Sequence, residues 1–176
     1  MKLSRLQLFA EAVSGKKIIY LYRVKKDAAS SDATAIAFTT ENGRTKSKDA
    51  DATETKDGSV RTPGASEVEI TATTLLAKGD SFIDTLEDAL DNNELLEIWE
   101  VNLEEKGTGD DADKYKAIYF QGYLTELEIT ANAEENVELS LTFGINGTGA
   151  RGYATVSDAQ KEIASYVYTD TQKTGA

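Results

Sequence analysis

A strict two-residue alternation near the C-terminal end of the chain is the feature that most constrains its fold. Between residues 137 and 145 every second side chain is apolar, and the side chains between them are polar or are glycine. The apolar positions are Val137, Leu139, Leu141, Phe143 and Ile145. Such a period places one face of an extended strand in a core and the other face in water. The segment therefore predicts a half-buried β-strand.

Further strands follow from similar patterns. Leu127 and Ile129 alternate with glutamates and a threonine, and the polar residues 131–136 can form a turn, so residues 126–145 are predicted to be an antiparallel hairpin. Residues 67–73 alternate in the same way. Four other segments are rich in strand-forming residues, namely 17–24, 33–40, 94–103 and 115–123. We therefore expect a mainly β fold, an antiparallel sandwich or barrel in a single domain over residues 1–176.

One helix is predicted over residues 81–91, where apolar side chains fall on one arc and acidic side chains on the opposite arc. Ser81 with Asp84 forms a plausible capping box, and Asp80 is an alternative cap. A weaker helical turn is predicted at Ser157, with Gln160 as its reciprocal cap. The helix is expected to flank the sheet with its acidic face outward.

The segment between residues 39 and 67 is polar, and its only large apolar side chain is Val60. A connection this long and polar inside a compact domain is usually functional or disordered. We expect a long polar loop over residues 41–66, mobile in the single subunit. The residues after the last predicted strand, 153–176, are expected to form a C-terminal arm.

Composition excludes most catalytic chemistry. The chain has no cysteine and no histidine, so catalytic triads, thiol nucleophiles and the usual zinc, haem and iron–sulfur sites are not available. A net charge of −12 disfavours a surface that grips phosphates. The longest apolar run, residues 18–22, is too short to span a membrane. We expect no enzyme, no cofactor, no metal and no membrane contact.

Three local motifs have simpler explanations than ligand binding. Residues 147–152 match G-x-G-x-x-G, but the neighbouring strands look antiparallel rather than βαβ, so an exit loop is expected there. The aspartates at 49–51 and 110–113 lack the spacing of a calcium loop and are expected in solvated loops. Trp99 and the tyrosines lie in strand patterns, where cross-strand packing is favoured over a sugar-binding platform.

The order of these elements, with their local sequences, resembles the major tail proteins of long-tailed bacteriophages. The resemblance is carried by short segments spread over nearly the whole chain. These are GKKIIYLYR at 15–23, KDGSV at 56–60, GD at 79–80, LEIWEV at 96–101, GYLT at 122–125 and YVYT at 166–169.

The resemblance implies a β-sandwich with one flanking helix that assembles into six-fold rings, which stack into the tail tube of the virion after assembly in the host cytoplasm. Genome DNA would pass through this tube without specific binding. The implied partners are further copies of the chain, a tape-measure protein, a tail terminator and a distal tail protein. The alternative hypothesis is a monomeric β-sandwich of a phage baseplate that binds carbohydrate or a partner.

Two sets of residues are candidates for these roles. If the apolar side chains of the hairpin 126–145 face the core, Glu126, Glu128 and Glu138 lie on the opposite face and are predicted to line the lumen. The tube exterior is the alternative place for that face, and the acidic face of the helix is the rival lumen candidate. The mixed charges of the polar segment suit contacts between rings, and the candidates there are Arg44, Lys46, Lys48, Lys56 and Asp57.

Overall fold

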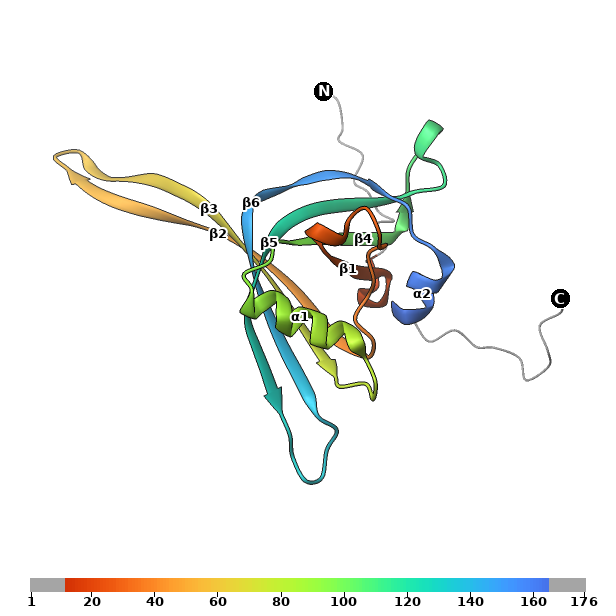
Figure 1. Ribbon diagram of the computed structural model, residues 1–176. Helices are drawn as coiled ribbons and strands as arrows, with labels where there is room; N and C mark the ends of the chain where they lie inside the picture. The colour runs from red at the N-terminus through yellow and green to blue at the C-terminus, as the bar shows by residue number, and fades with distance from the viewer. Residues whose placement is uncertain (1–11, 165–176) are drawn as a thin grey trace, which may run out of the picture.

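The computed structural model describes residues 12–164, which form one six-stranded antiparallel sheet with a helix against it (Figure 1). The order across the sheet is β1-β4-β5-β6-β3-β2. The strands are β1 (Ile18–Val24), β2 (Thr39–Thr55), β3 (Gly58–Leu75), β4 (Leu96–Lys106), β5 (Tyr115–Thr130) and β6 (Glu138–Ala154). The helices are α1 (Ser81–Asp91) and α2 (Asp158–Ala164), and three short 3-10 turns lie at Gly15–Lys17, Lys25–Asp27 and Gly109–Asp111. No helix within residues 12–164 is long and apolar enough to cross a membrane.

The sheet is bent so strongly that apolar side chains from strands far apart in the sheet pack against each other. Tyr22 on edge strand β1 stacks on Phe143 of β6, with ring centroids 5.2 Å apart, although these strands are not neighbours in the sheet. Ile83, Leu86 and Ala89 of α1 bury the remaining open side of the same core. The expected mainly β fold with a flanking helix is confirmed, but its sandwich-like core is built from a single sheet that does not close.

A second, smaller core lies on the other face of β1 and β4. Ile19, Leu21 and Val101 are buried there together with Val156, which follows β6. The helical turn predicted at Ser157 is present as α2, with the reciprocal cap to Gln160. The residues expected as a C-terminal arm therefore begin as the end of β6 and a packed helix, and positions 165–176, which include the YVYT segment, lie outside the described residues.

The polar segment 41–66 is not a loop. It forms nearly all of β2 and half of β3, which pair from Thr39–Thr74 to Thr55–Gly58, with two register shifts, around a turn at Lys56 and Asp57. The strand predicted at 67–73 is the inner part of β3. The prediction missed the pairing of 41–66 because a two-stranded ribbon has both faces in water and needs no apolar period. The strand expected at 33–40 is also wrong, since this segment makes a single bridge, Thr34 to Tyr22, before β2 begins.

The G-x-G-x-x-G segment is part of β6 rather than an exit loop. Gly147 and Gly149 have φ angles of 71° and 80°, in the left-handed region that favours glycine. They lie where the β5–β6 register shifts between Tyr119 and Gln121. A Cβ on Gly149 would come within 2.4 Å of the Phe120 ring, so these glycines allow a bulge to pack on the core.

Asp80, and not Ser81, is the N-cap of α1, because its carboxylate accepts a hydrogen bond from the Phe82 amide at 3.0 Å. Asp80→Ala should lower the free energy of unfolding by about 1 kcal/mol, since one helix amide loses its partner. Ser81→Ala is the matched control and should have little effect. Urea denaturation measures both, and a larger loss in the Ser81 variant would contradict the assignment.

Candidate functional site

The three glutamates predicted to line a lumen lie on one face of the β5–β6 hairpin. Glu126 is opposite Thr142, Glu128 is opposite Ser140, and Thr130 is opposite Glu138. All three glutamates are exposed. Their face is opposite to the one that buries Leu139, Leu141 and Phe143 in the core.

The same face continues across β3 and β2, and we call it the carboxylate face. The pairing registers align three further exposed glutamates and several hydroxyls with those of the hairpin. Its polar members are Glu126, Glu128, Thr130, Glu138, Ser140, Thr142, Glu67, Glu69, Thr71, Thr73, Glu41, Thr45 and Ser47. None of these side chains is basic, so the face carries six carboxylates with no counter-charge of its own.

A bulge at Thr125 sets which side chains of β5 reach this face. The β5–β6 register shifts between Leu124 and Glu126, and the Thr125 hydroxyl donates to the Thr142 carbonyl at 3.0 Å. Leu124 is buried before the bulge, and Leu127 packs against the same core after it. Ile129, expected in the core, is instead 52% exposed, because β5 is an edge strand there, with no strand beyond it.

Two of the unpaired strand edges border the carboxylate face. β4 pairs with β5 only as far as Gly122, so the edge of β5 from Tyr123 to Thr130 is free. β2 is the last strand on the other side of the sheet, and its outer edge is free along its length. Free edges present backbone donors and acceptors to which another chain can add a strand.

Beyond the last β3–β6 pair, at Val68, residues 46–66 continue as a two-stranded arm that projects from the rest of the subunit (Figure 1). Lys46 and Lys48 lie at its root, and Lys56 and Asp57 form its tip. A register shift after Lys48 lies close to Pro63, the only proline of the chain. Proline lacks an N–H and is tolerated at such irregular or edge positions.

Arg44, the fifth inter-ring candidate, precedes the arm on β2, and its side chain is bound within the same subunit. Its Nε and Nη2 donate to Glu100 on β4 at 2.6 and 3.2 Å, and the Tyr20 hydroxyl donates to the same carboxylate at 2.6 Å. We call this set the Arg44 bridge. It joins β2 to β4 and β1, which are distant in the sheet order, so no local sequence signal identified Glu100 or Tyr20.

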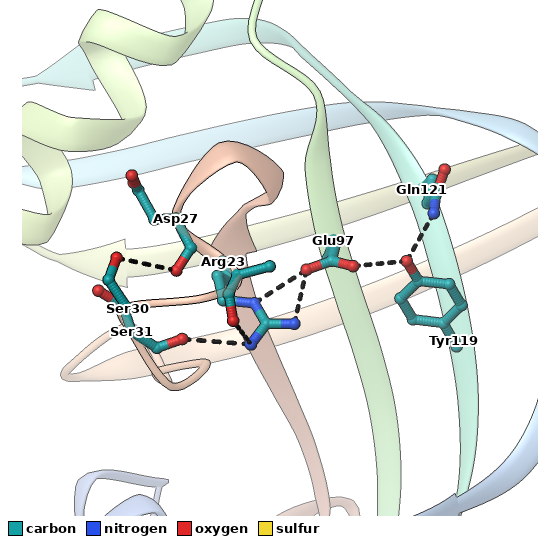
Figure 2. A network of polar contacts seen from close by, with 8 residues as sticks. Arg23, Asp27, Ser30, Ser31, Glu97, Tyr119 and Gln121 are labelled. Atoms are coloured by element: carbon teal, nitrogen blue, oxygen red, sulfur yellow. Dashed lines mark hydrogen bonds and ion pairs between the residues drawn. The ribbon is translucent and has the colours of Figure 1, made fainter.

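A second polar network holds Tyr119, one of the aromatic residues considered for sugar binding (Figure 2). Glu97, 7% exposed, accepts from Arg23 Nε at 2.8 Å and from the Tyr119 hydroxyl at 2.7 Å. Arg23 also stacks over Trp99, and Trp99 packs on Tyr119. These rings are therefore engaged in cross-strand packing, as the strand patterns predicted.

The described residues contain no group of three or more His, Cys, Asp or Glu side chains placed to hold a metal ion. The aspartates at 49 and 51 lie in the arm, and Asp111 pairs with Lys114. The surfaces that stand out are therefore the carboxylate face, the two free edges and the arm.

Comparison with known proteins identifies relatives by sequence and by fold. The sequence model of the family described as phage tail tube protein matches residues 12–151. A protein of Staphylococcus phage phiMR25, described as a tail protein, is 38% identical over 148 residues, which cover 82% of this chain and 77% of that protein. The SPP1 tail tube structure has a TM-score of 0.74 at 23% identity over 93% of both chains. The tail of an empty gene transfer agent (GTA) particle is a further match, from a structure refined with C6 symmetry. Its TM-score is 0.60 at 12% identity, over 82% of this chain and all of that one.

Removing the Arg44 bridge should loosen the root of the arm. Arg44→Ala should lower the free energy of unfolding by about 1 kcal/mol, because a partly exposed ion pair contributes little. Hydrogen exchange of the β2 amides near residue 44 should accelerate. Lys46→Ala is the control, and equal exchange in both variants would show that the bridge does not hold β2.

Stability should fall at alkaline pH because of Tyr20. Burial, and then the hydrogen bond to the Glu100 carboxylate, raise the pKa of Tyr20 well above its ordinary value of 10. Above about pH 10 the unfolded chain releases this proton while the folded chain keeps it, which favours unfolding until the pH passes the folded pKa. Tyr20→Phe should therefore reduce the dependence of the unfolding free energy on pH between 10 and 12. Urea titrations at both pH values measure this, and an unchanged slope would contradict it.

Proposed function

This chain belongs to the family of phage tail tube proteins, and we propose that the carboxylate face lines the lumen of a tube built from its six-fold rings. The protein is a structural component of the phage virion and assembles with copies of itself into the tail tube. The proposal concerns how the copies are arranged and what each surface does in that arrangement.

The observation that carries the proposal is the composition of the carboxylate face. Four adjacent strands present six exposed glutamates and no basic side chain on one face. A ring of such faces would surround a channel with negative charge, which the low-dielectric wall would focus inward. Genome DNA would be repelled from the wall and remain mobile, as a conduit requires.

The free edges support closure of a ring. Strands β2, β3, β6 and β5 alternate in direction, so β5 runs opposite to β2. When a neighbour related by rotation places its β2 beside the free edge of β5, the new pair is also antiparallel. Every joint between copies then repeats the pairing found inside a copy, and four strands from each of six copies would form one barrel.

The width of such a barrel agrees with six copies. With strands ~4.8 Å apart, 24 untilted strands have a circumference of ~115 Å and a backbone diameter of ~37 Å. Side chains reduce this bore but leave it wider than a DNA duplex, and strand tilt widens it further. Four copies would give a backbone diameter of only ~24 Å, which side chains would make too narrow.

The arm is proposed to contact a neighbouring ring through Lys46, Lys48, Lys56 and Asp57. It has four basic and four acidic side chains between residues 46 and 66, so it is neutral in a chain of net charge −12. The further partners implied for such a tube are a tape-measure protein, a tail terminator and a distal tail protein, with genome DNA passing through unbound.

Reversing the charge of the proposed lumen tests the assignment. Tubes carrying Glu126→Lys, Glu128→Lys and Glu138→Lys should retain duplex DNA that resists added nuclease, because lysine rings would bind phosphates inside the channel. Tubes with Glu87, Asp88 and Asp91 of α1, which are exposed, changed to lysine are the matched control and should bind only DNA that nuclease digests.

The opposite pattern of nuclease protection would assign the carboxylate face to the tube exterior. If the lysine variant does not assemble, electron microscopy of wild-type tubes provides the same test, because it shows directly whether these three glutamates face the channel.

A further inference from the structure

The end of the sheet opposite to the arm exposes two large apolar side chains. Phe38 is 62% exposed and Leu76 is 43% exposed, and they are adjacent because the Leu75 amide donates to the Phe38 carbonyl at 3.2 Å. Phe38 has a φ angle of 54°, a conformation that is unfavourable for a bulky residue. Such strain is often found at functional positions. We call this region the apolar end.

A hollow beside Leu76 extends the apolar end toward α1. Its lining includes the apolar Leu76, Ala77, Ile83 and Val137, three acidic residues and one basic residue, namely Asp80, Asp84, Glu135 and Lys78. The Leu76 amide donates to the Val137 carbonyl at 2.8 Å, which holds the β5–β6 turn against the end of β3. The hollow thus combines an apolar floor with a mainly acidic rim.

The tip of the arm differs from the acidic rest of the chain. Val60 is 55% exposed near the tip, and the arm around it is neutral because Lys56 and Arg61 balance Glu54 and Asp57. An exposed apolar group on a neutral arm can pack on an apolar hollow with a mainly acidic rim, and it avoids the like-charge repulsion expected between two acidic surfaces.

We propose that the apolar end binds the arm tip of a second copy, with Val60 packing against Leu76 and Phe38. Val60 and Leu75 are 15 positions apart on β3, about 50 Å along a strand, so a copy cannot bind its own arm. Because arm and apolar end lie at opposite ends of the same strands, the contact is heterologous and does not close between two copies. It therefore generates an open stack. This inference rests on the proposed function and adds the receiving surface for the arm.

Cysteine cross-linking tests the contact directly, because the chain has no native cysteine. Tubes of a variant with Val60→Cys and Leu76→Cys, treated with a short bismaleimide, should give a ladder of covalent multimers on a denaturing gel. A variant with Val60→Cys and Glu128→Cys is the matched control, because Glu128 lies on the carboxylate face, and it should give no ladder.

The outcomes separate this inference from the proposed function. If tubes form but the Val60/Leu76 pair gives no more multimers than the control, the apolar end does not receive the arm. If wild-type protein forms no tubes, the proposed function itself is wrong. If the cysteine at position 76 is already protected from alkylation in the unassembled subunit, a segment of the same chain occupies the hollow, and the inference is overturned.

A milder variant covers the case in which the cysteines prevent assembly. Phe38→Ser with Leu76→Ser should leave the subunit folded, because both side chains are exposed, and should raise the protein concentration needed for tube formation at least tenfold. Tyr153→Ser, which removes an exposed side chain of β6 outside both the apolar end and the free β5 edge, is the control. An equal effect of the two variants would contradict a specific role of the apolar end.

Discussion

The packing of one curved sheet against itself is the interaction on which the rest of the subunit depends. Tyr22 stacked on Phe143 brings edge strand β1 over β6, and α1 closes the side that the bend leaves open. The other face carries the second core over β1 and β4 and is left to water over the rest of the sheet. That outer face is where the glutamates of β2, β3, β5 and β6 are aligned.

Two glutamates of β4 and those of the carboxylate face differ in how far they are buried. Glu97 and Glu100 are held by arginine and tyrosine side chains, and these contacts connect strands that the sheet order keeps apart. A buried carboxylate is costly without such partners. The glutamates of the carboxylate face are exposed and remain available to act on whatever passes the surface.

The sequence predicted the elements that have a buried face. The hairpin 126–145 and helix 81–91 were predicted because their apolar period faces a core. The pairing of 41–66 was missed, since a ribbon with both faces in water has no such period. The exposure of Ile129 was missed for a different reason: alternation gives the face of a side chain but not whether anything covers it. The Arg44 bridge depends on contacts between distant strands, which local patterns cannot identify.

The even number of strands between the two free edges has a mechanical consequence for an assembled tube. Where a joint between copies has the same antiparallel hydrogen-bonded ladder as the interior of a copy, the ring has no seam. Any outward force on the wall would then be shared evenly by all the ladders around the circumference. Rupture would have no preferred starting point, so a wall only one sheet thick at its lumen can be strong without a thicker subunit.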